Sequence, residues 1–154
     1  MGMKNVWAAV VTVVAACGSV IVAAPAAAAN PPACPTVNVV AVPGTWETSN
    51  TPDPSRGNGM LAQVTSGLPA GTRVDYVQYP ASAFPWEGEV YVASRNRAVD
   101  NARALIAATA AHCPLTNFAL VGYSQGADAA GDLAAAIGTG LDVVGPHRLV
   151  AVGL

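Results

Sequence analysis

The chain has 154 residues, of which 53% are hydrophobic and only 10% are charged, and its formal net charge is −2. Proteins that grip the nucleic-acid backbone need a basic surface, so this composition argues against a nucleic-acid partner. The three cysteines and two histidines show no paired ligand spacing. A zinc site is therefore disfavoured, and neither a metal nor a cofactor is expected.

The N-terminal residues have the pattern of an export signal. A short start containing Lys4 precedes an apolar stretch over residues 6–22, and residues 23–30 form a zone of small side chains rich in alanine. This order of segments is typical of a secretory signal peptide. We predict cleavage after Ala29, which leaves residues 30–154 as one exported domain, either secreted or held in the cell envelope.

Two alternatives to cleavage are open for this segment. Residues 6–24 reach the length that a bilayer span requires, so the segment could stay as a membrane anchor. Residues 14–17 resemble a bacterial lipobox, which would place a lipid on Cys17. The apolar core continues past Cys17, which argues against the lipid.

Removal of the signal leaves two cysteines, Cys34 and Cys113. An exported compartment is oxidising and allows such a pair to form a disulfide. Closing a loop of about 80 residues would stabilise the fold by roughly 4 to 5 kcal/mol on the chain-entropy model.

From Thr36 onward, strand and helix patterns alternate. A β-branched run over residues 37–42 is followed by Pro43 and predicts a buried strand. A helix is expected over residues 59–66. Residues 72–79 alternate polar and apolar side chains, which indicates a half-covered strand.

The second half of the chain continues this alternation. Apolar residues recur near the helical period over residues 87–112, and an apolar strand pattern follows over residues 118–121. An alanine-rich helix is expected over residues 128–137, and a strand over 149–152 should pair beside the strand at 118–121. Alternating strands and helices predict an α/β three-layer sandwich with a mostly parallel central sheet.

The most specific motif places Ser124 between Gly122 and Gly126, where the strand at 118–121 gives way to a helix. This arrangement is typical of a nucleophile elbow, a strained strand-to-helix turn that exposes the serine hydroxyl at the carboxyl edge of a sheet. Side chains at the two glycine positions would collide with the neighbouring strand and helix. Ser124 is therefore the candidate nucleophile.

A second segment, residues 43–47, follows the first strand and should reach the same edge of the sheet. An oxyanion hole needs one backbone N–H from a loop and one from the residue after the nucleophile. Those donors would be Thr45 and Gln125. The alternative interpretation is that Thr45 is an ordinary turn residue without a catalytic role.

The sequence shows no evident histidine base or acid to act with Ser124 in catalysis. Hydrolases with this elbow take their acid and then their histidine after the serine, yet only thirty residues follow Ser124. His112 is expected to cap a helix carboxyl end, and His147 to lie at the amino end of a strand, so neither is expected to act as the base. Asp128 and Asp132 are expected on a partly exposed helix face.

Together, the Gly-Thr-Trp-Glu run at residues 44–47, the elbow at 122–126 and a cysteine before each of the two strands resemble the cutinase family, especially its exported actinobacterial members. The resemblance spans about residues 34–154. It implies a lidless α/β-hydrolase esterase with Ser124 as nucleophile, Thr45 and Gln125 in the oxyanion hole, the Thr45 hydroxyl as a further donor, and a disulfide between Cys34 and Cys113.

The family's catalytic aspartate, second disulfide and histidine would lie beyond Leu154. The sequence therefore looks like the N-terminal portion of such an enzyme. We expect the fold to be incomplete at its C-terminal side and the 154-residue chain to be inactive.

Two functional classes compete. The first is a secreted serine esterase acting on lipid or cutin-like polyester, monomeric at full length and associated with the cell envelope or a membrane surface. The second is a non-catalytic envelope binding protein on a hydrolase scaffold, because fold does not fix function. Phe84, Pro85 and Trp86 form an apolar loop that could line an acyl groove or pack against the long helix.

Overall fold

The computed structural model describes residues 31, 33–53 and 58–154. The expected signal peptide, its cleavage after Ala29 and the alternative roles of the segment around Cys17 lie outside these residues. None of the helices that the structure describes is both long enough and apolar enough to span a bilayer.

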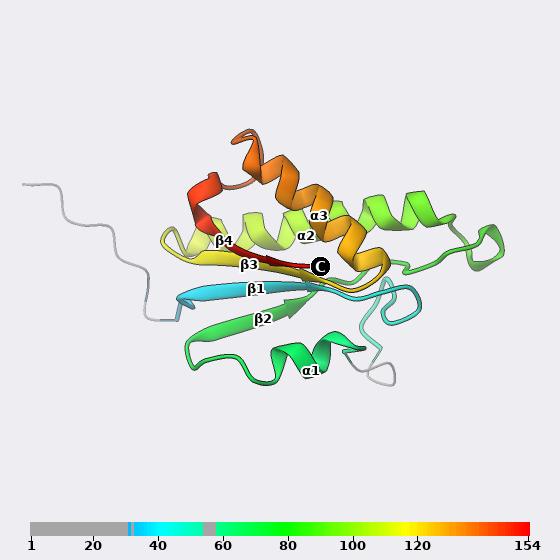
Figure 1. The fold of residues 1–154 in the computed structure, drawn as a ribbon, viewed down its shortest axis with the longest axis horizontal. Helices are drawn as coiled ribbons and strands as arrows, with labels where there is room; N and C mark the ends of the chain where they lie inside the picture. The colour runs from blue at the N-terminus through cyan, green and yellow to red at the C-terminus, as the bar shows by residue number, and fades with distance from the viewer. Residues whose placement is uncertain (1–30, 32, 54–57) are drawn as a thin grey trace, which may run out of the picture.

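A four-stranded parallel sheet forms the centre of the molecule (Figure 1). Its spatial order is β2-β1-β3-β4, so β4 pairs with β3 as the sequence predicts. Because all four strands run the same way, their carboxyl ends meet at one edge, and the loops that follow them share that edge. The strand bounds are β1 Val37–Val42, β2 Thr72–Tyr76, β3 Asn117–Gly122 and β4 Leu149–Gly153.

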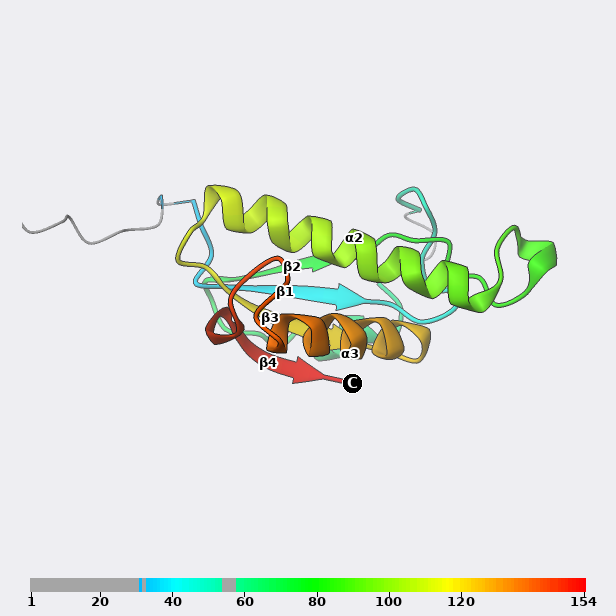
Figure 2. The same cartoon turned by 90° about the horizontal axis from the view of Figure 1, so that it is seen from above.

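Two long helices, α2 (Tyr91–His112) and α3 (Gln125–Gly138), pack against each other over one face of the sheet (Figure 2). The expected helix at 87–112 begins later than predicted. Pro85–Glu87 forms a separate 3-10 turn, η1, and Gly88 follows it with φ +106°, a conformation that ends the turn.

The short helix α1 (Leu61–Thr65) lies on the opposite face of the sheet. Tyr76, which stands beside Ala41 in the β1–β2 register, shares a hydrogen bond with the Thr65 hydroxyl. Alternate residues of β1, Val40 and Val42, instead face the helices α2 and α3. The three layers of the predicted α/β sandwich are therefore present.

The main core fills the space between the sheet and the helices α2 and α3. Large apolar side chains come mainly from the strands, and small alanines line the helices, which lets the two helices approach the sheet closely. Burying one large side chain of this kind stabilises the fold by about 1.5 to 3 kcal/mol. The central members are Val40, Val42, Phe118, Leu120, Ala98, Ala102, Ile106, Ala129, Ala130, Leu133 and Ile137.

A disulfide joins Cys34, before β1, to Cys113, directly after α2, with 79 residues of separation in sequence. The amino edge of the sheet is fixed there by two hydrogen bonds as well. The Thr116 hydroxyl donates to the Pro35 carbonyl at 2.6 Å, and the Asn117 amide donates to the Thr36 carbonyl at 3.1 Å.

We expect removal of this crosslink to destabilise the protein by about 4 kcal/mol, because the unfolded chain regains the entropy of a long open loop. The measurement is urea unfolding of the Cys34→Ala/Cys113→Ala variant beside the parent protein. A reducing agent should lower the stability of the parent and leave that of the variant unchanged. Equal stability of the two oxidised proteins would contradict the prediction.

Candidate active site

Ser124 stands at the carboxyl edge of the sheet, between β3 and α3, and is exposed. Its backbone has φ 53° and ψ −120°, a region that non-glycine residues rarely adopt. Holding a residue there costs on the order of 1 to 3 kcal/mol and needs surroundings that fix it. This backbone is the sharp turn expected of the elbow.

The two elbow glycines have no room for a side chain. A Cβ on Gly122 would lie 2.4 Å from the Gly126 carbonyl oxygen. A Cβ on Gly126 would lie 1.9 Å from the carbonyl oxygen of Val42. Both obstacles are backbone atoms, so the turn closes only with glycine at the two positions, as the sequence predicts.

The contact at Gly126 brings the loop after β1 against the start of α3. Thr45, in this loop, donates its hydroxyl to the Gln125 side-chain oxygen at 3.3 Å. The backbone N–H groups of Thr45 and Gln125 donate to no atom of the described residues. Gln125 is the first residue of α3, where an unpaired N–H and the helix dipole both favour negative charge. The structure therefore brings the three predicted residues Ser124, Thr45 and Gln125 to one place.

The Gln125 side chain is fully buried and ties three segments together. Its amide nitrogen donates to the Ser82 carbonyl at 2.9 Å and to the Tyr91 carbonyl at 3.2 Å, while its oxygen accepts from Thr45. The sequence analysis used only the backbone of Gln125. The burial of its side chain depends on tertiary contacts and leaves no signal in the local sequence.

Glu47 fixes the shape of the loop after β1. One carboxylate oxygen accepts from the Gly44 amide at 2.8 Å, and the other from the Met60 amide at 2.9 Å. The Tyr79 hydroxyl holds the same loop by donating to the Pro43 carbonyl at 2.5 Å, and burial raises the pKa of Tyr79. This tyrosine stays protonated as a donor at any physiological pH.

Glu87 holds Trp46 and the loop of residues 83–87 together. Its carboxylate accepts from the Ala83 and Phe84 amides at 2.8 and 3.0 Å and from the Trp46 indole N–H at 2.8 Å. These donors, the two amides first, hold the pKa of Glu87 below its usual value. Trp46 also has φ 65°, and its amide donates to the Ala81 carbonyl at 2.8 Å.

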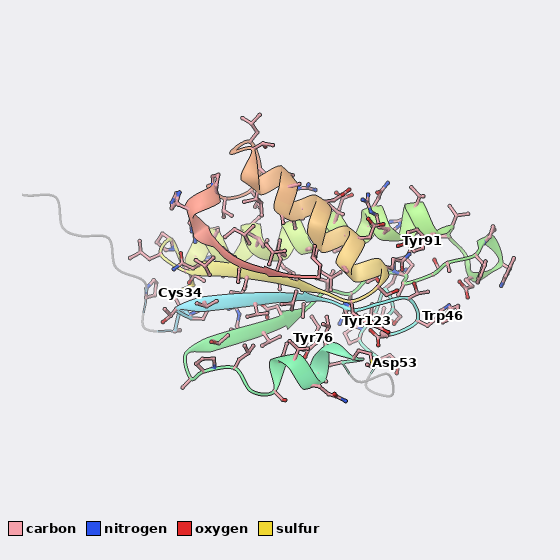
Figure 3. The ribbon with its side chains drawn as sticks, in the orientation of Figure 1. Cys34, Trp46, Asp53, Tyr76, Tyr91 and Tyr123 are labelled. Atoms are coloured by element: carbon pink, nitrogen blue, oxygen red, sulfur yellow. A yellow bond between two sulfur atoms is a disulfide. The ribbon has the colours of Figure 1, made fainter. Side chains whose placement is uncertain are left out.

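Exposed aromatic side chains gather at this edge of the sheet. Trp86 is 79% exposed and its ring stacks on that of Phe84, with 4.6 Å between ring centres. Trp46 and Tyr123 lie at the same end of the molecule (Figure 3). Of the two interpretations of the Phe84–Trp86 loop, packing against the long helix does not fit this exposure.

The two histidines lie at the opposite edge. His112 is the last residue of α2, beside the disulfide, and His147 lies in the 3-10 turn η2 (Pro146–Arg148) that leads into β4. A six-residue strand such as β3 is about 20 Å long, and Ser124 follows its far end. Neither histidine is therefore in reach of the Ser124 hydroxyl, as the sequence predicts.

Asp128 and Asp132 do not complete the site either. Both belong to α3 and pair with Arg95 of α2, with 3.3 Å between the Arg95 Nε and the Asp128 carboxylate. Their side chains are about half exposed, which confirms the expected helix-face positions. Among the described residues, no three His, Cys, Asp or Glu side chains come together as a metal site would require.

Comparison with known proteins gives consistent matches. A family model described as Cutinase matches residues 33–144. The carboxylesterase Culp6 homolog of Corynebacterium glutamicum is 31% identical, and the match covers 81% of this chain and 44% of that protein. The chain thus spans less than half of this curated relative.

Two solved structures show the same fold. An acetyl xylan esterase, solved as an iodinated complex, has a TM-score of 0.57 at 23% identity, covering 77% of this chain and 61% of that one. A cutinase-like protein from Cryptococcus sp. has a TM-score of 0.53 at 22% identity, covering 80% of this chain and 54% of that one.

The close approach at Gly126 gives a test of the elbow. We expect Gly126→Ala to lower the free energy of unfolding by about 3 kcal/mol or more, because the added methyl meets backbone that cannot move aside. The matched control is Gly131→Ala on the same helix, where a Cβ would meet only the Leu154 side chain at 3.4 Å. That change should be neutral or stabilise by about 0.5 to 1 kcal/mol. Similar effects of both substitutions on urea unfolding would contradict the elbow packing.

Proposed function

The chain belongs to the cutinase family, and we propose that the protein is a secreted serine esterase that hydrolyses carboxylic esters of lipid or cutin-like polyester. The one observation that carries this proposal is the position of Ser124. The serine is exposed on a strained turn, next to the amides of Thr45 and Gln125, which have no partner among the described residues.

In the proposed reaction, the Ser124 oxygen attacks the ester carbonyl carbon and a histidine base takes the hydroxyl proton. The carbonyl oxygen becomes an oxyanion, which the amides of Thr45 and Gln125 hold by hydrogen bonds. The Thr45 hydroxyl would add a third donor by turning from the Gln125 side chain. The carbon–alkoxy bond then breaks, the histidine proton passes to the leaving alcohol, and water hydrolyses the acyl-serine by the same steps.

The base in this mechanism is neither His112 nor His147, because both lie at the amino edge of the sheet. We propose that the histidine and its carboxylate partner are supplied from outside residues 31–154. The 154-residue chain should then hold the nucleophile and the oxyanion donors without an activating base. An unactivated serine hydroxyl is a poor nucleophile near neutral pH, so this chain would be inactive.

The exposed aromatic side chains support an apolar acyl substrate. Phe84 and Trp86 lie on the loop between β2 and α2, and Gln125 connects this loop to the oxyanion donors. The stacked rings on that loop offer an apolar surface on which the acyl chain of an ester, or the lipid that contains the ester, can bind. The Cys34–Cys113 disulfide supports an exported location, as does the expected signal peptide over residues 1–29.

A second candidate is a non-catalytic envelope binding protein. The observation that favours it is the distance of both described histidines from Ser124. The two functions differ in whether Ser124 reacts.

We expect the protein isolated from the cells that make it to be labelled at Ser124 by a fluorophosphonate probe, because an activated serine attacks phosphorus as it attacks a carbonyl. Mass spectrometry of the labelled peptide identifies the residue. Ser124→Ala should abolish labelling, and Ser49→Ala, which changes a serine in a loop, should leave it intact. Labelling at another residue would reject the assignment, and no labelling would favour the binding protein.

The 154-residue chain expressed alone should hydrolyse p-nitrophenyl butyrate no faster than its Ser124→Ala variant, because the base is missing. Initial rates at pH 8 for the two proteins, corrected for buffer hydrolysis, give the comparison. Hydrolysis that needs Ser124 and is lost in His147→Ala would show that our interpretation of His147 is wrong.

A further inference from the structure

A groove separate from the Ser124 site lies between α2 and the outer edge of β2. It has a volume of about 530 Å³, within the range of roughly 300 to 1,000 Å³ that is usual for ligand sites. Its lining residues are Asn50, Tyr76, Gln78, Asn101, Ala104 and Leu105. The strand β1 separates β2 from β3, which leads into Ser124, so the groove is not part of the candidate active site.

The lining is polar but uncharged. Three of its six residues, Asn50, Gln78 and Asn101, carry carboxamides, each with two donor hydrogens and an acceptor oxygen. None of the six described lining residues is a Lys, Arg, Asp or Glu, so this part of the wall offers a charged ligand no opposite charge. Ala104 and Leu105 supply an apolar part. Such a surface suits a ligand that carries both hydroxyl and C–H groups. The hydroxyl groups can donate hydrogen bonds to the carboxamides and accept them, and the C–H groups can pack on Ala104 and Leu105.

One residue of the strand β2, Tyr76, belongs to this lining. In the described sheet β2 is an outermost strand, paired only with β1. The outer N–H and C=O groups of such an edge strand have no ladder partner. Hydroxyls of a ligand can bond to them in either direction.

Several hydrogen bonds hold the groove in shape before any ligand binds. The Asn101 side chain donates to the Gln78 carbonyl at 2.6 Å, which connects α2 to the end of β2. The Tyr76 hydroxyl is paired with Thr65 of α1. The Ser49 hydroxyl donates to the Thr51 carbonyl at 2.6 Å and so fixes the turn that carries Asn50. A preformed site avoids the entropy cost of ordering its walls on binding.

The groove continues along α2 toward the amino edge of the sheet. A second cavity of about 370 Å³ shares Leu105 with the first and reaches His112. Asn101 and His112 are about 16 Å apart along the helix axis. The charges in this second part are matched, because Arg73 pairs with Asp75 at 3.0 Å and also bonds to the Thr109 hydroxyl.

From this geometry we propose that the groove binds a neutral polysaccharide chain. The site is elongated and preformed, and its described lining residues are rich in donors and acceptors and carry no net charge. This is the chemistry that a chain of sugar hydroxyls requires. A peptide or a second copy of this chain would need large apolar anchors, and of the six lining residues only Leu105 and Tyr76 are large and apolar or aromatic. The proposal does not depend on catalysis at Ser124.

The test is a titration of the purified full chain that is monitored by NMR of the side-chain amides. The ligands are the neutral sugars xylohexaose and cellohexaose and the charged analogue hexagalacturonate. We expect at least one neutral hexasaccharide to bind and to shift the amide signals of Asn50, Gln78 and Asn101. Ala104→Glu, which places a charged side chain in the groove, should weaken binding at least tenfold. The matched control Ala107→Glu, at an exposed position of α2 outside the lining, should change it less than twofold.

Ser124→Ala should bind the sugar as the parent does, so failure of the esterase proposal would leave this result unchanged. Asn101→Ala should weaken binding while Asn96→Ala, elsewhere on α2, should not. The proposal is overturned if neither neutral sugar binds, if hexagalacturonate binds as tightly, or if both Glu substitutions act equally. It is also overturned if sedimentation shows that the groove is occupied by a second copy, with Ala104→Glu dissociating a dimer.

Discussion

The absence of a side chain at Gly126 is the constraint on which the edge around Ser124 depends. The carbonyl oxygens of Val42 and Pro43 occupy the space in which a Cβ would lie, at 1.9 and 2.5 Å. This contact sets the start of α3 directly on the end of β1. As a result the loop that carries Thr45 reaches the residue after Ser124, and the side chains of Thr45 and Gln125 are joined by a hydrogen bond. If α3 were displaced from β1 by the width of a methyl group, Thr45 and Gln125 would lie further apart.

The rest of this edge consists of loops that hold one another through buried hydrogen bonds. Gln125 connects Thr45, Ser82 and Tyr91, and Tyr79 holds the Pro43 carbonyl. A buried polar group without a partner costs about 1 to 3 kcal/mol, so each bond also resists displacement of its loop. This rigidity would suit the proposed oxyanion site, whose donors must stay in place while charge develops on a substrate. It also provides the support that the strained backbone of Ser124 requires.

The sequence was sufficient to predict those features that arise from local pattern. The parallel sheet, the elbow with Ser124, and the meeting of Thr45 with Gln125 follow from strand order and from the shared carboxyl edge. The start of α2 was placed four residues early, because Glu87 continues the helical pattern while Gly88 ends the turn before it. The Glu87 contact with Trp46 joins residues 41 positions apart, and the Asn101 contact with Gln78 in the groove joins residues 23 positions apart. Nothing in the local sequence indicates such contacts.

The two outer strands of the described sheet differ in chemistry, and this difference bears on what each can bind. β2 carries Arg73 and Asp75, charged side chains of the kind that oppose pairing with a further strand, and its edge opens onto polar residues. β4 has no charged residue, and Val150 and Val152 are 54% and 44% exposed. An uncharged, apolar outer strand pairs readily with another strand, whereas charged side chains on an outer strand oppose such pairing. Within the described sheet, β2 is therefore the outer strand less suited to pairing with a further strand.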